Sequence, residues 1–238
     1  MRLIAASVTA VALMATAGHA QEAGLLPSLE RLAKTDNPEA IYHLGMAYHT
    51  GSGAAKDLNK ALAAFRKAAA LGDPLASYKI GCYYDGQGAG LVSFDEEKAL
   101  EYKLVAAKAG YALAEQDVGI LYARRGNMAE GLAWLEKSAS QGWTESLLTL
   151  ASVYNGTSGI TPDPAKTAAY FRLFLSRSEP DAQQEAWLSR FEQQLSPGDK
   201  KRAEEIVRRY RFTPTLLTLK GLSGQRAAQA LIQTSISR

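Results

Sequence analysis

Few residues of this chain have the types and spacings that catalysis or metal binding requires. His43 and His49 are six positions apart, which does not place both on one face of a helix. No His-Glu-x-x-His pattern, paired cysteine or aspartate-rich calcium loop accompanies them. We interpret both histidines as structural, with a metal or acid–base role as the alternative. The sequence thus predicts no catalytic residue, no metal site and no cofactor.

Three glycine-containing segments match chemical motifs only in part. Residues 51–53 (Gly-Ser-Gly) and 86–88 (Gly-Gln-Gly) lack the preceding strand and the Gly-Lys-Ser/Thr ending of a phosphate-binding loop. Residues 221–224 (Gly-Leu-Ser-Gly) lack the second glycine, two places after the serine, of a nucleophile elbow. These segments therefore predict turns and not reactive sites.

The chain has one cysteine, Cys82, so it cannot form an intramolecular disulfide. The fold must consequently be stabilised by burial alone, which a chain of this length can achieve. We interpret Cys82 as a small buried hydrophobic residue, and a thiol facing a binding groove as the alternative.

A repeat in the sequence predicts the elements that would position any site. A glycine, or an alanine in the last copy, precedes a tyrosine by three residues at Gly45/Tyr48, Gly81/Tyr84, Gly119/Tyr122 and Ala151/Tyr154. An eleven-residue spacing follows at Ala61 to Gly72, Ala99 to Gly110 and Gly131 to Gly142. Only the connection between these two halves varies in length. Constant packing distances with one variable loop are typical of stacked helical hairpins.

This pattern predicts an all-α fold, a solenoid of about four helical-hairpin repeats with a terminal capping hairpin. Apolar residues at three- and four-residue steps support each helix, and Asn37-Pro38 is a helix start signal. The expected segments are a signal peptide (1–20), a leader (21–37), repeats at 38–74, 75–111, 112–143 and 144–180, the last degenerate, a capping hairpin (181–212) and a basic C-terminal tail (213–238). Whether that tail is ordered stays open.

The N-terminus predicts export. Arg2 precedes an uncharged apolar stretch from Leu3 to Ala17, and the small residues of 18–20 (Gly-His-Ala) suit cleavage near Ala20. The stretch is too short, and too rich in alanine and threonine, to favour a permanent membrane span. We therefore expect a periplasmic or secreted protein without a stable span, and an uncleaved anchor is the alternative.

Two segments are similar to a known repeat family. Leu44-Gly45-x-x-Tyr48-x-x-Gly51-x-Gly53, followed by Lys60-Ala61-x-x-x-Phe65-x-Lys67-Ala68-Ala69-x-x-Gly72, resembles the Sel-one-like repeat, a relative of the tetratricopeptide repeat. The resemblance covers about residues 38–178 and implies a right-handed α/α superhelix that acts as an adaptor or scaffold. A cysteine-rich secreted branch of that family is associated with β-lactam binding, but its cysteine pairs are missing here, so that activity is not carried over.

The resemblance also implies a concave groove lined by the first helix of each repeat. Transferring the tetratricopeptide groove positions gives Tyr42, Met46, His49, Tyr78, Cys82, Asp85, Gln116, Ile120, Ala123, Leu148, Ser152 and Asn155. Mixed aromatic, apolar and polar side chains suit an amphipathic helix or an extended peptide. Interhelical packing is the alternative role for Tyr42 and Tyr78.

Charge separates the C-terminal part from the rest of the chain. Net charge is +3 overall, and residues 198–238 hold nine Lys/Arg against three Asp/Glu. A solvated face is the simplest interpretation, and weak contact with an anionic envelope polymer is the alternative; nothing favours nucleic acid. The leading hypothesis is a non-enzymatic exported adaptor that binds a protein or peptide. A cell-wall or β-lactam hydrolase and a cell-wall-binding module remain alternatives.

Overall fold

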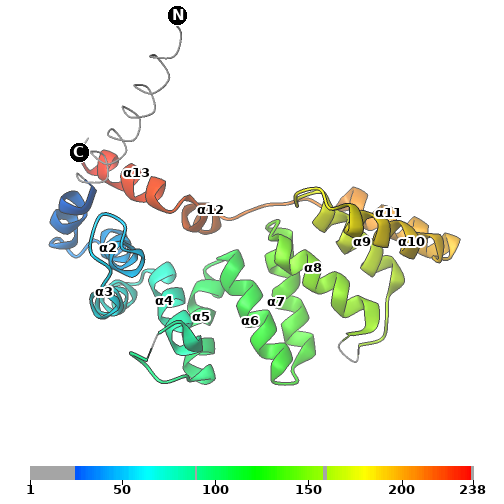
Figure 1. Ribbon diagram of the computed structural model, residues 1–238, viewed down its shortest axis with the longest axis horizontal. Helices are drawn as coiled ribbons and strands as arrows, with labels where there is room; N and C mark the ends of the chain where they lie inside the picture. The colour runs from blue at the N-terminus through cyan, green and yellow to red at the C-terminus, as the bar shows by residue number, and fades with distance from the viewer. Residues whose placement is uncertain (1–24, 89, 158–159, 237–238) are drawn as a thin grey trace, which may run out of the picture. The chain divides into compact units, whose positions relative to one another are not determined.

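The computed structural model describes residues 25–88, 90–157 and 160–236, and over these residues the chain forms helices and turns without a β-strand (Figure 1). This confirms the all-α class. The expected signal peptide lies outside the described residues.

The chain divides into two compact units, one of residues 1–102 and 220–238 and one of residues 103–219. The described part of the first unit contains a helix at residues 25–33, α2 (Pro38–Thr50), α3 (Leu58–Ala70), α4 (Pro74–Cys82), the π-helical turn η1 (Tyr83–Gln87) and α13 (Gln225–Ile236). The second contains α6 (Ala112–Arg124), α7 (Met128–Ser140), α8 (Thr144–Ser152), the π-helical turn η2 (Val153–Thr157), α9 (Pro164–Leu175), α10 (Ala182–Gln193) and α11 (Pro197–Arg209). The unit boundaries fall inside α5 (Glu96–Lys108) and α12 (Leu216–Ser223).

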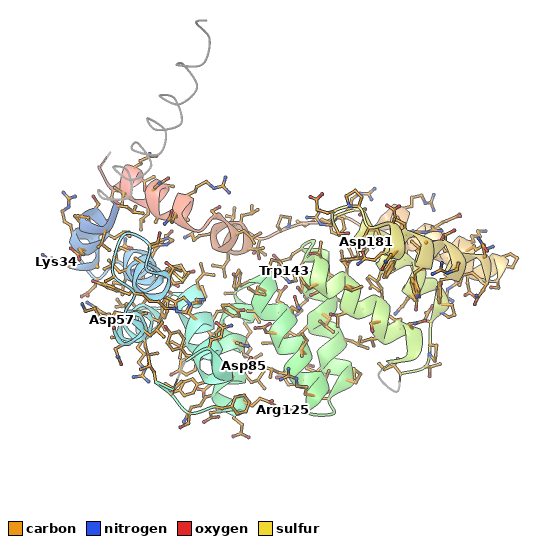
Figure 2. The ribbon with its side chains drawn as sticks, viewed as in Figure 1. Lys34, Asp57, Asp85, Arg125, Trp143 and Asp181 are labelled. Carbon is orange, nitrogen blue, oxygen red and sulfur yellow. The ribbon has the colours of Figure 1, made fainter. Side chains whose placement is uncertain are left out.

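The variable loop inside each hairpin closes in the same way despite its changing length. The residue before the second helix donates its backbone N–H to the carbonyl of the repeat tyrosine, over 2.9–3.0 Å. In three of the four hairpins that residue is an aspartate, and in the third it is asparagine, which are favoured helix N-caps. The pairs are Asp57/Tyr48, Asp95/Tyr84, Asn127/Tyr122 and Asp163/Tyr154 (Asp57 is labelled in Figure 2).

The turns between repeats use glycine for a backbone conformation that other residues adopt with strain. Gly72, Gly110 and Gly142 have φ angles of 92°, 86° and 86°, and each N–H closes the end of the preceding helix. Asp36, with φ 56°, takes the corresponding place after the helix at residues 25–33. The segment expected as a leader therefore contains a helix that ends as the second helix of a repeat does.

Small residues let the paired helices approach closely. In the α6–α7 pair, a Cβ atom added to Gly119 would lie 2.8 Å from Leu135 Cγ and 2.9 Å from the carbonyl oxygen of Gly131. A Cβ at Gly131 would in turn lie 2.8 Å from the carbonyl oxygen of Gly119. In the first repeat, Gly45 leaves the space that the ring of Phe65 fills, 2.6 Å from the position of such a Cβ.

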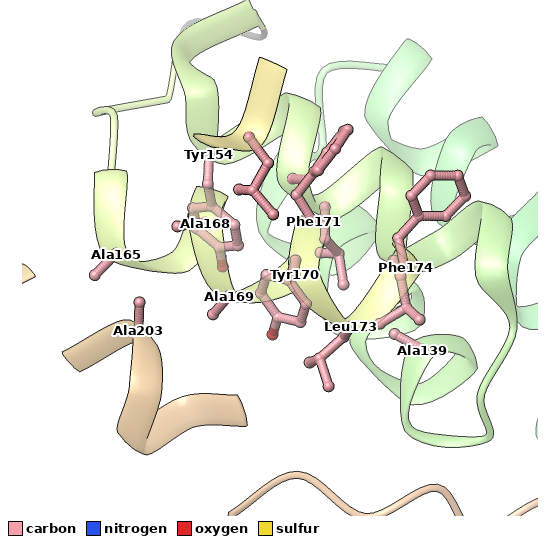
Figure 3. Packing of buried hydrophobic residues seen from close by; sticks show 14 of the residues in the cluster. Ala139, Tyr154, Ala165, Ala168, Ala169, Tyr170, Phe171, Leu173, Phe174 and Ala203 are labelled. Atoms are coloured by element: carbon pink, nitrogen blue, oxygen red, sulfur yellow. The ribbon is translucent and has the colours of Figure 1, made fainter. Parts of the chain in front are cut away.

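The core of the second unit is built around α9, which contacts α8, α10 and α11. Its buried residues include alanines in the first half of the helix, Ala165, Ala168 and Ala169, and large side chains in the second half, from Tyr170 to Phe174 (Figure 3). The cluster includes Tyr154, Ala168, Phe171, Leu188 and Ala203.

After α11 the chain runs along the second unit and is fixed there by hydrogen bonds. The N–H of Thr213 donates to the carbonyl oxygen of Ser140, at 2.9 Å. The hydroxyl of Thr215 donates to the carbonyl oxygen of Gly110, at 2.6 Å, and the hydroxyl oxygen of Thr218 accepts from the backbone N–H of Ala112, at 2.9 Å. The start of the segment expected as a basic tail is thus an ordered part of the fold.

A buried side-chain network joins this segment to α6. Gln141 donates its amide to the carboxylate of Glu115, at 2.8 Å, and accepts from the hydroxyl of Thr218, at 2.7 Å. Glu115 is buried. Burial raises the pKa of Glu115 above its ordinary value, and the hydrogen bond from Gln141 and the charge of Lys137 offset only part of that rise.

In the first unit, α13 packs against α2 and the helix at residues 25–33. Ala228 and Leu29 are each 2% exposed, and Leu231 and Ile232 pack beside them. The ammonium group of Lys220 donates to a carboxylate oxygen of Glu39, at 2.8 Å. The described part of residues 213–238 contains two helices, α12 and α13.

We expect Gly119→Ala to lower the free energy of unfolding by about 1–3 kcal/mol, because the added methyl overpacks the α6–α7 crossing. This holds although alanine is intrinsically the better helix former by about 1 kcal/mol. Chemical denaturation followed by circular dichroism measures the change. Gly198→Ala is the matched control: it lies in α11, and its Cβ would meet only Ser196 Oγ, at an ordinary 3.7 Å. Equal destabilisation by both changes would contradict the proposed helix contact.

The raised pKa of Glu115 predicts a pH-dependent contribution to stability. The folded state holds the proton more tightly than the unfolded state, so this contribution is present below the ordinary glutamate pKa and is lost as pH rises through the folded-state value. Glu115→Gln should therefore be more stable than the parent at pH 8, and the difference should shrink at pH 4. Thermal melts at both values test this, with exposed Glu204→Gln as the control. A difference that is larger at pH 4 would overturn the assignment.

Candidate functional site: an interaction groove

The predicted groove residues lie where the repeat placed them, on α2, α4, α6 and α8 or on the π-helical turns that follow α4 and α8. At the last groove position of each repeat, Asp85 and Asn155 lie on the π-helical turns, whereas His49 and Ala123 lie within α2 and α6. Their exposure differs strongly from repeat to repeat.

In the first unit, the aromatic groove candidates are buried. Tyr42, Tyr78 and Cys82 are 9%, 7% and 2% exposed, which favours the packing role for the two tyrosines and the buried interpretation of the single cysteine. Met46, His49 and Asp85 are partly exposed.

The histidines serve packing contacts in this unit. The Nδ1 atom of His49 lies 3.0 Å from the hydroxyl of Tyr83, and burial followed by the charge of Lys79 lowers the pKa of His49. His43 is 6% exposed and lies between Glu39 and the ring of Tyr42. Across the described parts of the chain, no three His, Cys, Asp or Glu side chains are grouped so that they could hold a metal ion.

In the second unit, the groove candidates become more exposed toward the fourth repeat. Gln116, Ile120 and Ala123 are partly exposed, and Ile120 packs against the buried core cluster. Leu148, Ser152 and Asn155 are exposed, and Leu148 reaches 38%.

These three α8–η2 residues line one cavity. It has a volume of about 220 Å³ and is completed by Ala151, Phe171 and Trp187, from α8, α9 and α10. The rings of Phe171 and Trp187 are 4.7 Å apart between centroids, and Trp187 stacks on Phe191 at 5.1 Å. The cavity, which we call the α8–α10 hollow, therefore has an aromatic wall with polar groups beside it.

Three residues that line the α8–α10 hollow were not predicted as groove residues: Ala151, Phe171 and Trp187. Phe171 and Trp187 lie on α9 and α10, whereas the transferred groove positions consider only the first helix of each repeat. A usable signal was present, because Trp187 and Phe191 are four residues apart on a helix and so share a face. The hollow can accept one apolar side chain of a ligand, because its volume and its aromatic lining suit a buried apolar group.

A second recurring feature lies at the hairpin loops. The ammonium group of a lysine three residues after the N-cap aspartate lies over the repeat tyrosine ring: Lys60 over Tyr48 at 5.4 Å, Lys98 over Tyr84 at 5.4 Å and Lys166 over Tyr154 at 4.3 Å. Such cation–π contacts stabilise a loop by about 0.5–1 kcal/mol at exposed sites. We assign them to loop closure and not to binding.

Part of the basic C-terminal charge is compensated within the units. Arg202 pairs with Asp163 and Asp199, at 2.8 and 3.1 Å, Arg209 pairs with Glu205, and Lys220 pairs with Glu39. The possible contact with an anionic polymer stays a prediction. Of the helices in the described ranges, none combines the length and apolar character that crossing a bilayer requires.

Comparison with one solved structure supports the fold. The chain is similar to a Sel1 repeat protein from Oxalobacter formigenes, with 24% identity, a TM-score of 0.60 and 76% of each chain covered. It also matches c5321, described as a protective antigen of uropathogenic Escherichia coli strains displaying an SLR fold, with 21% identity, a TM-score of 0.46, and 87% of this chain and 50% of that chain covered. Comparison with curated proteins finds no match.

The family model of the Sel1 repeat matches at residues 38–73, 74–111, 107–143 and 145–176, together more than half of the chain. These ranges contain the four hairpins whose loops close on the repeat tyrosines. The expected α/α solenoid is thereby confirmed. With its hairpins, their glycine turns and this match in agreement, the chain belongs to the Sel1 repeat family.

Proposed function

We propose that this protein is an exported, non-enzymatic scaffold that holds a partner peptide in the groove of its repeat array. Sel1 repeat proteins are generally protein–protein interaction scaffolds, which supports the general role. The single observation that carries the specific proposal is the α8–α10 hollow, because three predicted groove residues line it together.

The lining of the hollow defines the kind of peptide that fits. Leu148, Phe171 and Trp187 offer an apolar surface of about the size of one large side chain. Beside them, the amide of Asn155 can both donate and accept a hydrogen bond, which suits the backbone of an extended peptide. The proposed ligand is therefore a segment with one leucine, phenylalanine or similar anchor inserted between α8 and α10.

Export is part of the proposal and rests on the N-terminal sequence. The uncharged apolar stretch and the small residues that end at Ala20 support a cleaved signal peptide. The partner would then be a periplasmic or extracellular protein.

Trp187→Ala should weaken peptide binding by 30-fold or more, about 2 kcal/mol, because a central aromatic anchor is a typical hot spot. The measurement uses a displayed peptide library selected on the parent protein, followed by titration of the best binder against each variant. Leu148→Asp provides a second test, because Leu148 is exposed and its replacement places a desolvated charge at the hollow without removing core contacts.

Leu71→Asp is the matched control, since Leu71 is also an exposed leucine, at 42%, but it follows α3 and does not line the hollow. It should leave the affinity unchanged. Selected peptides that bind all three variants as well as the parent would overturn the proposed site. Turnover of a cell-wall or β-lactam substrate by the parent would instead favour the hydrolase alternative.

A further inference from the structure

Helix α12 exposes a row of leucines to solvent. Of the large apolar side chains that are exposed in the described parts of the chain, three lie within this one helix: Leu216, Leu219 and Leu222, at 85%, 46% and 57%. Leu219 is three residues from each of the other two, so the side chains form a continuous row, which we call the α12 leucine stripe. Exposed apolar residues that gather in this way mark a contact surface, whereas single scattered ones do not.

The other side of α12 is held in place by polar contacts. Thr218 is 2% exposed, and its hydroxyl donates to Gln141 Oε1, at 2.7 Å, and accepts from the backbone N–H of Ala112, at 2.9 Å. The N–H of Thr218 donates to the hydroxyl of Thr215, at 3.1 Å, just before the helix begins. A surface helix usually turns its apolar side chains toward the core and its polar ones toward water. In α12 a polar side chain is buried and the leucines are exposed, so packing does not explain the α12 leucine stripe.

The sequence around α12 is basic. Residues 206–238 contain six lysine or arginine residues and no aspartate or glutamate. Lys220 is compensated by its ion pair with Glu39. Arg211 and Arg226, which flank α12 in the sequence, are exposed. The guanidinium group of Arg211 donates to backbone carbonyl oxygens, which carry no net charge, so this residue keeps its positive charge.

This combination favours a lipid surface over a second copy of the chain. In a symmetric dimer the same patch of both copies would meet, so the basic segments would repel each other. An anionic bilayer instead attracts them, and the attraction acts over about 10 Å at 0.1 M salt without direct contact. A fluid lipid surface also adapts to a helix whose leucines project outward.

We propose that α12 binds the surface of an anionic lipid bilayer, with the α12 leucine stripe inserted at the boundary between headgroups and acyl chains. Burial of the leucines provides the adhesion, and the flanking arginines select anionic over neutral lipids. The eight residues of α12 rise about 12 Å along the helix axis, so the helix lies on the bilayer and does not cross it. The inference does not depend on the α8–α10 hollow, which other helices line.

Co-sedimentation of the full-length protein with lipid vesicles tests the proposal. The parent should bind vesicles of phosphatidylcholine and phosphatidylglycerol tenfold or more tightly than vesicles of phosphatidylcholine alone. Leu216→Ser together with Leu222→Ser should weaken binding to the anionic vesicles tenfold or more, because less apolar surface is buried. Leu71→Ser together with Phe94→Ser is the matched control: these residues are exposed at 42% and 66% but lie outside α12, and binding should not change.

A second pair of variants tests the charge. Arg211→Gln together with Arg226→Gln should weaken binding to the anionic vesicles and leave binding to phosphatidylcholine vesicles unchanged, because only the electrostatic attraction is lost. Lys56→Gln together with Arg66→Gln removes the same charge from exposed positions of the first repeat and should weaken binding less.

A fluorescent label reports whether α12 itself enters the lipid. The single cysteine, Cys82, is buried, so Leu216→Cys provides one accessible thiol for an environment-sensitive dye. Addition of anionic vesicles should shift the emission of this dye to shorter wavelength. The same dye at Ala63→Cys, an exposed position of α3, should not respond. The comparison separates α12 from every other part of the chain that contacts lipid.

The proposal is overturned if the dye at position 216 does not respond to anionic vesicles, or if the paired leucine variant binds them as the parent does. It is also overturned if the dye shifts without lipid as the protein concentration rises and light scattering gives the mass of a dimer. A second copy of the chain would then cover the α12 leucine stripe.

Discussion

Close approach of helix backbones is the constraint on which this structure depends. At the α6–α7 crossing the carbonyl oxygens of Gly119 and Gly131 occupy the space that each other's side chain would need. The same requirement places Gly45 against Phe65 in the first hairpin. Because these distances are fixed, the length differences between repeats fall in the loops, where one backbone hydrogen bond to the repeat tyrosine is enough to close each hairpin.

The repeats could be predicted because their contacts are local and recur. Glycine is required at several equivalent positions, either by a close helix contact, as at Gly45 and Gly119, or by a positive φ, as at the three inter-repeat glycines. A single sequence therefore shows each requirement more than once. The C-terminal segment could not be predicted in this way. Its partners are far away in the chain, as Thr215 and Gly110 show with 105 positions between them, and a contact made once leaves no periodic signal.

The candidate site shows the same division between repeated and unique contacts. Leu148, Ser152 and Asn155 were found because they occupy positions defined by the repeat, while Trp187 was missed because α10 lies outside the matched repeats. Tyr42 and Cys82 occupy equivalent positions and yet are buried. Repeat position therefore identifies a face of the array, but neighbouring side chains decide which parts of that face remain open.

The packing of α13 on α2 has a consequence for how the protein forms. Leu29 and Ala40 are buried together with Ala228, so the first repeat is completed by a helix that follows all four repeats in the chain. A newly made chain therefore cannot complete the packing of α2 until α13 has also been synthesised.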